Sequence, residues 1–491
     1  MRARYKAFVL SLLVPLGASA QGIGLLRLDA PQKGAKGSAS IYGGFEEGGY
    51  KPAFQASSLW KAGAGAEGVL HAHGTSWQGS FSFEQMSGKE MFTSMFLEPG
   101  YFPVDVLEFT PGDKMRQTYR LGGGFASTLG DDFLILGAKA TYSASNYAKR
   151  KDIRHTTYGM SLRVEPTVTF KMYDKAGLSL AYIFQKRTES IDAEQVGAAT
   201  DLSYFAFLDT GLRYGTYQVW DGDGLHLDEA GVGVFPVKEY QHGVAYILEI
   251  PGFSSGMEGF WKRGFVGENG YDWFRYPGHG LSLFLERKWA RQSLRLDAKI
   301  QDDQLEEAVL DKVSAGGVTT PVVYAYNAVS DRTWGSVDLT YGIRFTQGHL
   351  KRLQAVLHGG AWTEKSYLMY PYSDRNDRYN ASATLVAAFS FGRVDVGLRV
   401  NGGAGTWKEQ GLQGGTDSVE SVPFRLEGDW VRKMEYFSTT KAGAGLTLTY
   451  HLKAVKGLFV QAEGSWLHGF GVVLLPGTDR RSAGLRVGYG F

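Results

Sequence analysis

The sequence contains no cysteine, few prolines, no bias toward one sign of charge and only one long apolar run. Without cysteine, the 491-residue chain has no disulfides to stabilise it in an oxidising compartment. Lys and Arg total 52 against 50 for Asp and Glu, and no basic block stands out, so nucleic acid is not an expected partner. After the N-terminus no window approaches the roughly 20 apolar residues of a transmembrane helix, which excludes a helical membrane protein.

The single apolar run lies at the N-terminus and has the layout of a secretory signal. Three basic residues among the first six precede AFVLSLLVPLGA, and the small residues ASA at 18–20 follow. This order predicts a signal peptide over residues 1–20 and a mature chain that begins near Gln21. Because no cysteine follows the apolar run, a lipid-anchored lipoprotein is excluded. Residues 21–36 are expected to form a periplasmic N-terminal segment.

Glycine and aromatic residues are abundant, with 66 glycines and 14 % aromatics, and the rest of the chain alternates apolar and polar residues. WQGSFSFE (77–84), MSLRVEPTVTFK (160–171) and VDVGLRVN (394–401) each have one apolar face and one polar face at a period of two. The alternation persists for about 8 to 12 residues, which is longer than a soluble sandwich strand and matches a tilted strand that crosses a bilayer. An all-β fold, a transmembrane antiparallel β-barrel, is therefore predicted.

The connections between these strands alternate between tight turns and long loops. Outer-membrane barrels show this asymmetry, with short turns on the periplasmic side and long loops outside. We expect the barrel to span 37–491 with 16 strands. A count of 14 applies if the first hairpin lies outside the wall, and 18 if the long extracellular excursion 190–275 contributes to it. Within that excursion, 210–220 and 239–250 could pair as a hairpin beyond the membrane or across the pore mouth.

Tryptophan positions give a second indication of a membrane-spanning wall. Trp77 and Trp289 fall near short turns, whereas Trp334, Trp407 and Trp466 fall near long-loop ends of their strands. Rings at both ends of the strands are expected to form aromatic girdles at the two membrane interfaces.

The chain ends in GLRVGYGF (484–491), which alternates like a strand of the wall. Its apolar residues are expected to face lipid, and Arg486 is expected to face the lumen. Tyr489 and Phe491 resemble the C-terminal strand signal that the barrel assembly machinery reads. A barrel must close on itself, so this strand is predicted to pair with the strand near Ser38 to Glu46.

The polar faces of the strands are expected to line the lumen, because a charge that faces lipid at mid-depth costs about 2 to 4 kcal/mol for Arg or Lys. Charges of both signs are mixed there. A water-filled passage for polar solutes and a lumen closed by ion pairs both remain open, and the long loops could fold in as a constriction or reach out to a partner. The expected lumen-lining residues are Arg163, Glu165, Lys171, Arg295, Asp297, Lys299, Asp338, Arg344, Asp395, Arg399, Glu463 and Arg486.

Three short motifs suggest cofactor or metal sites but lack the context that such sites need. The G-x-G-x-x-G spacing at 63–68 has no following helix, so a dinucleotide loop is not expected. His71 and His73 share one strand face and could chelate a metal with a third ligand, but polar residues beside a turn are the favoured interpretation. DGDG at 221–224 lacks the distal Glu of an EF-hand and is expected to be a turn. Neither a cofactor nor a metal is predicted.

A catalytic site is not expected either. The sequence has no G-x-S-x-G elbow, and no strand presents an Asp-His or His-Ser pair that a neighbouring strand visibly completes. An outer-membrane hydrolase is therefore the least favoured function.

The stretch from Met95 to Arg154 resembles an uncharacterised family of Bacteroidota outer-membrane β-barrels, catalogued as a domain of unknown function. The similar parts are the proline-containing loop before YRLGGGFA, the hairpin that follows it, and the YSASNYAKRKDIR segment. The resemblance implies a porin-like barrel that accompanies TonB-dependent uptake systems. It implies no catalytic residues.

Together these observations predict an outer-membrane protein in contact with lipid and lipopolysaccharide. Its expected role is a channel or accessory component for uptake of polar nutrients or metal complexes. The alternative is a non-conducting binding or scaffold partner of a TonB-dependent transporter. The chain is too short to be a 22-stranded transporter with its own plug domain.

Overall fold

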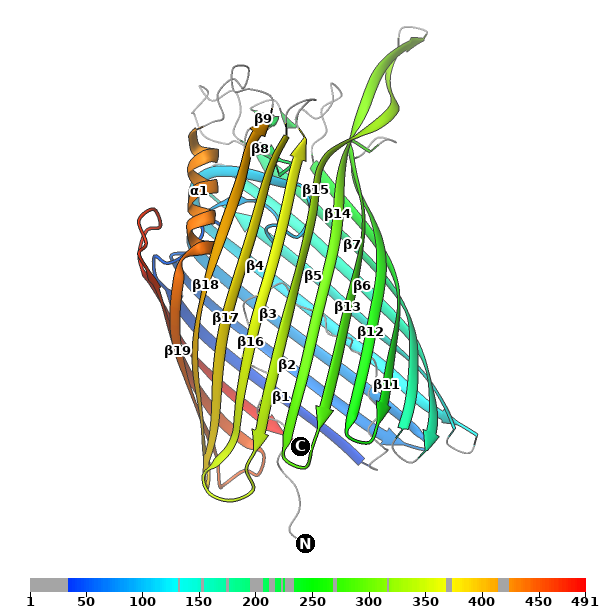
Figure 1. The fold of residues 1–491 in the computed structure, drawn as a ribbon, viewed down its shortest axis with the longest axis vertical. Helices are drawn as coiled ribbons and strands as arrows, with labels where there is room; N and C mark the ends of the chain where they lie inside the picture. The colour runs from blue at the N-terminus through cyan, green and yellow to red at the C-terminus, as the bar shows by residue number, and fades with distance from the viewer. Residues whose placement is uncertain are drawn as a thin grey trace.

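The computed structural model describes most of the chain after residue 33. The described residues are 34–130, 133–151, 154–173, 176–194, 206–211, 217–221, 224–225, 234–267, 272–315, 318–367, 373–413 and 424–491. They form a large closed antiparallel β-barrel (Figure 1). The predicted signal peptide and nearly all of the predicted N-terminal segment lie outside the described residues. Strand β1 begins at Gly34, slightly before the predicted start of the barrel at residue 37.

Eighteen strands form the barrel wall, each paired with the next in an antiparallel ladder. The wall strands are β1 (Gly34–Glu47), β2 (Ser58–Ala72), β3 (Thr75–Ser94), β4 (Asp105–Leu129), β5 (Leu134–Lys149), β6 (Arg154–Tyr173), β7 (Ala176–Glu194), β11 (Val234–Ile250), β12 (Phe253–Val266), β13 (Phe274–Lys288), β14 (Gln292–Ala315), β15 (Val318–Arg344), β16 (Leu350–Tyr367), β17 (Ser373–Phe391), β18 (Val394–Gln413), β19 (Thr440–His451), β20 (Leu458–Phe470) and β21 (Asp479–Gly490). Three short strands lie outside this series: β8 (Ala206–Asp209), β9 (Tyr217–Asp221) and β10 (Gly224–Leu225).

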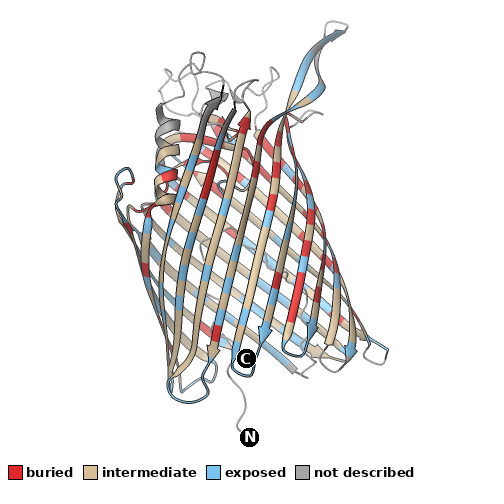
Figure 2. Ribbon diagram, in the orientation of Figure 1, coloured by how far each residue is buried: buried red, intermediate tan, exposed pale blue. Residues whose placement is uncertain are grey.

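The period-two pattern sets the two faces of the wall. Along β18, Leu398 and Val400 are exposed on one face, while Asp395 and Arg399 alternate with them on the other. An apolar outer face and a polar inner face are what a bilayer around a water-filled or plugged lumen requires. Figure 2 shows many of the buried residues in the upper part of the barrel, toward the long-loop end.

Tight turns join the strands at one end of the barrel. Gly74, Gly252, Gly392 and Gly457 occupy four of these turns with positive φ angles, a conformation that glycine adopts at little cost. Strand β1 begins and β21 ends at this end (Figure 1). The short turns and long loops therefore lie at opposite ends, as predicted.

The barrel closes through β1 and β21. Their register pairs Ser38 with Gly490 and Glu47 with Arg481. Phe491 and Gly37 also exchange two backbone hydrogen bonds, each 3.0 Å. The predicted pairing of the last strand with the strand near Ser38 to Glu46 is confirmed.

The predicted fold class is confirmed, with 18 strands, the upper value of the expected range. The two strands beyond the expected 16 are β11 and β12, which lie in the wall rather than in an extracellular excursion over the whole of 190–275. Segment 239–250 belongs to β11 and pairs with β7 and β12, not with 210–220. β12 escapes a periodicity search because its outward face includes Ser255 and Gly259 and its inward face includes Phe260.

Among the described residues the helical segment is α1 (Phe424–Ser438), between β18 and β19. No described helix has the length and apolar character needed to span a membrane.

Candidate functional site: a plug in the outer half of the barrel

The connection between β3 and β4 folds into the barrel instead of extending outward. Two non-glycine residues near the end of β3, Glu90 and Thr93, have positive φ angles of 54° and 71°, and the β3–β4 register shifts on both sides of Met91. Such conformations cost about 1 to 3 kcal/mol each and need support from surrounding contacts. They turn residues 95–104, which we call the plug loop, toward the barrel interior. The outer end of β4 then pairs with β8.

An apolar cluster surrounds the plug loop and resembles the core of a soluble domain. Met95, Phe96 and Phe102 are each at most 3 % exposed. Burial of one such side chain contributes about 1.5 to 3 kcal/mol, so the cluster as a whole holds the loop firmly. The remaining members are Val104 of the plug loop, Trp273 just before β13, and residues from the outer end of β4, from β8 and from the inner faces of six wall strands: Val106, Ile191, Ala193, Ala206, Leu208, Phe235, Val237, Val266, Phe274, Tyr276, Leu305 and Val329.

Arg332 on β15 binds the tip of the plug loop through its backbone. Its Nη1 donates to the carbonyl oxygens of Gly100 and Phe102 at 2.9 Å, and its Nη2 donates to the carbonyl of Tyr101 at 2.7 Å. Nη2 also forms an ion pair with Asp303 at 2.8 Å. One buried guanidinium thus satisfies three consecutive carbonyls that would otherwise be desolvated without partners, which fixes the backbone of the loop.

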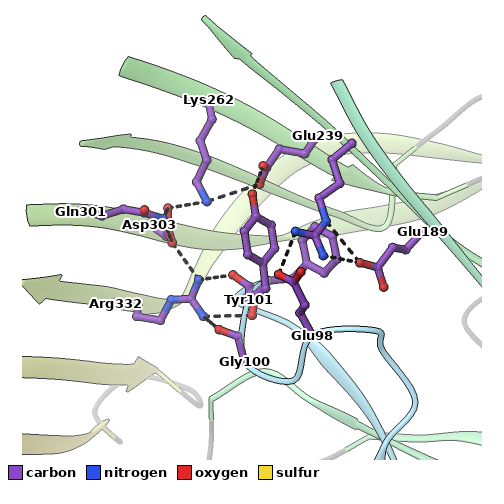
Figure 3. A network of polar contacts seen from close by, with 11 residues as sticks. Glu98, Gly100, Tyr101, Glu189, Glu239, Lys262, Gln301, Asp303 and Arg332 are labelled. Atoms are coloured by element: carbon purple, nitrogen blue, oxygen red, sulfur yellow. Dashed lines mark hydrogen bonds and ion pairs between the residues drawn. The ribbon is translucent and has the colours of Figure 1, made fainter. Parts of the chain in front are cut away.

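A chain of charges continues from Asp303 to the side chain of Tyr101 (Figure 3). Lys262 lies 3.0 Å from Asp303 and 3.3 Å from Glu239, and the Tyr101 hydroxyl donates to Glu239 at 2.7 Å. All three charged side chains are almost completely buried. Buried charges are costly unless they are paired, and here the three charges pair within the wall while the plug loop adds the Tyr101 hydroxyl as a donor to Glu239.

Arg187 completes the network on the other side of Tyr101. Its guanidinium lies 3.8 Å from the Tyr101 ring centroid and pairs with Glu98 at 3.1 Å and Glu189 at 2.7 Å. Glu189 in turn accepts a hydrogen bond from the backbone N–H of Leu97 at 3.1 Å. The cation–π contact and the ion pairs hold the loop from both faces of its aromatic side chain.

A second buried ion cluster holds the base of the plug. Glu108 pairs with Lys114 at 3.1 Å and with Lys149 at 2.8 Å, and all three side chains have no exposed surface. Lys114 also donates to the carbonyl of Ser94, the last residue of β3, at 3.2 Å. The plug loop is therefore fixed at its tip and at its base.

Helix α1 and the β1–β2 connection (residues 48–57) lie next to each other at the outer opening of the barrel, which we call the mouth. The ring centroids of Tyr50 and Tyr436 are 5.1 Å apart, and Tyr50 is fully buried. Glu435 accepts hydrogen bonds from the backbone N–H groups of residues 473–475 in the β20–β21 connection, at 2.6 to 3.1 Å. Helix α1 thereby links two loops of the outer end.

Burial raises the pKa of phenol and carboxyl groups at the plug tip and around α1. Burial, followed by the charge of Glu239, raises the pKa of Tyr101 well above its ordinary value, so its hydroxyl remains a donor at neutral pH. Burial raises the pKa of Asp429 on α1 to about 6, while Lys433 opposes the shift and Asp209 adds to it. Burial likewise raises the pKa of Asp209.

The twelve predicted lumen residues lie on the same face of the wall as Arg332, and the structure pairs several of them. Arg163 forms ion pairs with Glu165 and, at 3.3 Å, with Glu258. Arg295 pairs with Asp297 at 2.6 Å. These pairs lie on the face of the wall that also carries Arg332.

The other predicted residues have more varied neighbours. The Lys299 ammonium lies 4.4 Å from the Trp334 ring centroid, and Arg486 lies 5.2 Å from that of Tyr42. Arg344 faces Arg352 across the β15–β16 ladder, and Glu463 lies beside Gly484. Arg399 is opposite Val386 and Gly445, and Lys171 is opposite Gly177 near a short turn.

Asp338 and Asp395 have partners that sequence reasoning missed. Asp338 accepts from His358 on the next strand at 2.8 Å, and Asp395 lies 2.9 Å from Nε2 of His451. The expectation that no neighbouring strand completes an Asp-His pair is therefore wrong. The register that aligns these residues depends on turn lengths that a single sequence does not specify.

The two histidines lie at a tight turn, as expected, and three of the five tryptophans are exposed. Nδ1 of His71 lies 2.6 Å from the Ser76 hydroxyl across the first tight turn, while His73 occupies the turn itself. Trp77, Trp289 and Trp466 are exposed, as girdle residues are.

Trp334 and Trp407 do not belong to a girdle. Trp334 stacks with Trp362 inside the barrel at 6.2 Å, and Trp407 contacts Trp430 of α1 at 5.2 Å. The expected outer girdle is wrong at these two positions, because each lies on the polar inner face of its strand.

Sequence reasoning missed the plug network as a site, because Asp303 and Arg332 lie 29 residues apart and only the β14–β15 register brings them together. A usable signal was the apolar content of MFLEPGYFPVDV (95–106), which a solvated loop does not need.

Comparison with solved structures gives similarity at the level of overall fold. The chain is similar to the copper transporter OprC (9 % identity, 94 % of this chain and 81 % of that chain, TM-score 0.43). It is also similar to the ferric enterobactin receptor PfeA of Pseudomonas aeruginosa (10 %, 94 % and 81 %, 0.43) and to the FrpB iron transporter of Neisseria meningitidis (9 %, 93 % and 82 %, 0.40). These TM-scores are below 0.5, so the functional argument rests on this chain's own residues.

A search of curated proteins found no match. A family model, described as a family of unknown function (DUF6850), matches residues 28–491. That match covers nearly the whole chain, and the protein therefore belongs to the DUF6850 family.

Proposed function

We propose that the protein is an outer-membrane channel for polar solutes whose outer mouth is closed at rest by its own plug loop. The observation that carries the proposal is the contact of Arg332 with three consecutive carbonyls of residues 100–102 inside the barrel. A loop held in this way blocks passage without filling the rest of the lumen. Barrels of 16 to 18 strands are wide enough for an aqueous channel below such a plug.

The inner face below the plug supports passage of polar rather than apolar molecules. Asp338, Asp395 and Arg295 are only partly buried there, and each already has a partner of opposite charge or a histidine. Mixed, partly solvated charges provide alternating hydrogen-bond donors and acceptors along a passage. They favour no single sign of solute charge, in keeping with uptake of polar nutrients or metal complexes.

The burial of the plug indicates what opening requires. The apolar cluster and the two buried ion clusters contribute many kcal/mol, so thermal motion alone opens the loop rarely. Opening therefore needs a ligand or partner that binds the displaced state more tightly. The expected setting is the outer membrane, after export by the predicted signal peptide and assembly by the barrel assembly machinery through Tyr489 and Phe491.

A second candidate function is a non-conducting scaffold for a larger transporter, of the TonB-dependent class that the sequence suggested. The outer parts of β14 and β15 extend beyond the rim as a long hairpin (Figure 1). This hairpin exposes Val309, Leu310, Val313 and Tyr324. Exposed apolar side chains on a projecting element favour contact with another protein.

Planar-bilayer conductance separates the two functions. The test compares the wild-type protein with a variant in which residues 96–103 are replaced by a short Gly-Ser linker. The channel proposal predicts little current from the wild type and a large, stable current from the variant. A variant that folds, as heat-modifiable gel mobility reports, and still gives no current would contradict the channel and favour the scaffold.

A further inference from the structure

The outer face of β7, β11, β12 and β13 is arranged in layers. From the short-turn end upward, outward residues such as Leu180, Val244 and Met257 form an exposed apolar belt. On β12 the outward series from Phe253 to Trp261 spans about 27 Å along the strand at about 3.3 Å per residue. After correction for strand tilt, this length covers most of the roughly 25 Å apolar band of an outer-membrane barrel.

An aromatic row caps this belt in a single register. Phe184, His242, Trp261 and His279 are consecutive partners across the four strands. His242 stacks on Trp261 at 5.7 Å, and its Nδ1 lies 2.6 Å from the Tyr182 hydroxyl. Such a row marks the level at which lipid tails give way to headgroups.

Four cations lie immediately above the aromatic row. One step further toward the long-loop end, Lys186, Tyr240 and Arg263 are cross-strand partners on the lipid-facing side. One step beyond that, Lys238, Phe265 and Arg275 are partners in the same way. Lys238, Arg263 and Arg275 are exposed. Adjacent strands lie about 4.8 Å apart, so the backbones at Lys186 and Arg263 are separated by about 10 Å, and Tyr240 lies on the strand between them. Acidic residues near the patch are Glu306, which pairs with Arg275, and Asp272.

The adjacent sector of the wall differs at the same height. There Asp302, Asp331 and Asp377 face outward on β14, β15 and β17. The cations of this sector lie against them: Arg375 pairs with Asp377 at 3.1 Å, and Lys365 is the cross-strand partner of Asp331. An excess of cations over acidic residues is therefore a property of the β7–β13 sector, whereas acidic residues outnumber cations in the adjacent one.

We propose that Lys186, Lys238 and Arg263 form a binding site for the phosphate groups of lipopolysaccharide in the outer leaflet. The lipid tails lie on the apolar belt, the sugar backbone contacts Tyr240 and the aromatic row, and the phosphates meet the cations. Arg275 supports the site from its upper edge, where Glu306 and the Tyr326 ring, 3.8 Å away, hold it in place. The site requires that the long-loop end of the barrel faces the outer leaflet, and it is independent of whether the lumen conducts.

Native mass spectrometry in detergent, with purified lipid A as the probe, tests the site. The test variant carries Lys186→Gln, Lys238→Gln and Arg263→Gln. Three cations at a membrane surface are expected to contribute on the order of a hundredfold in affinity. A matched control carries Lys365→Gln and Arg375→Gln in the acidic sector and is expected to bind lipid A as the wild type does. Heat-modifiable gel mobility confirms that each variant is a folded barrel.

Three comparisons decide the outcome. Dephosphorylated lipid A and phosphatidylethanolamine are expected to bind weakly to all forms, and inorganic phosphate is expected not to displace lipid A. Equal binding of lipid A by wild type and triple variant would overturn the proposal. So would equal binding of the dephosphorylated lipid, an equal loss in the control, or full displacement by inorganic phosphate.

Discussion

At the residue scale, the plug depends on a few buried charges of the wall that pair with one another and bind polar groups of the loop. Arg332 binds loop carbonyls, including that of Tyr101, and pairs with Asp303, whereas the Tyr101 hydroxyl binds Glu239. Loss of one member of a buried charged pair costs more than the pair contributed, because the remaining group is left desolvated. Single substitutions in this network are therefore expected to weaken the attachment of the plug loop strongly.

Arg332→Met is expected to weaken attachment of the plug loop by about 3 to 5 kcal/mol, because it removes the partner of three carbonyls and leaves Asp303 with Lys262. Hydrogen exchange measures this as faster opening of residues 95–104. Arg295→Met removes a partly exposed pair on the same inner face and is the matched control. Equal protection of the loop in wild type and Arg332→Met would contradict the assigned role.

Tyr101→Phe tests the side-chain contact separately. The ring still packs under Arg187, but Glu239 loses the hydrogen bond of the hydroxyl, at an expected cost of about 1.5 to 3 kcal/mol. The same exchange experiment should rank this variant between the wild type and Arg332→Met. An effect larger than that of Arg332→Met would indicate that the side chain, not the backbone, anchors the loop.

At the element scale, docking of helix α1 should depend on pH. The pKa of Asp429 is raised to about 6 in the docked helix, against an ordinary value of 3.8. Docking is thus strongest below about pH 4 and weakens as the pH rises through about 6, by up to about 3 kcal/mol. Lys433 and Arg432 limit the effect, and Asp209 adds to it.

Exchange of α1 amides measured at about pH 5 and pH 8 tests this dependence, after correction for the intrinsic exchange rate. Slower opening at the lower pH is expected. Asp429→Asn should remove most of the difference, with a remainder from Asp209. A difference of the opposite sign, or one unchanged in Asp429→Asn, would contradict the assignment.

Some elements of the fold could be predicted from the sequence and others could not. Regular strands such as β6 and β18 were predictable because lipid on one side and polar groups on the other enforce alternation over their whole length. β12 was not, since Phe260 packs inward and glycine and serine face outward. The plug loop was predicted only as a long segment, because its conformation is set by contacts with β15 and β12, far away in sequence.

At the scale of the whole molecule, closure through β1 and β21 followed from the sequence, because a barrel leaves no free strand edge. The state of the lumen did not follow. An inner face of mixed charges is compatible with an open passage and with one closed by ion pairs, and the choice depends on where loops 95–104 and 48–57 fold. In the proposed channel the closure lies in the outer half, where the plug loop is buried.

The absence of cysteine permits a direct measurement of that closure. Thr340→Cys places a thiol on the inner face of β15 below the plug, and Val337→Cys places one on the lipid face as a control. In intact cells a membrane-impermeant maleimide should not label Cys at 340 from outside in the otherwise wild-type protein. It should label the same position when residues 96–103 are replaced by the Gly-Ser linker. Equal labelling with and without the plug loop, or none in either, would contradict a channel closed by this loop.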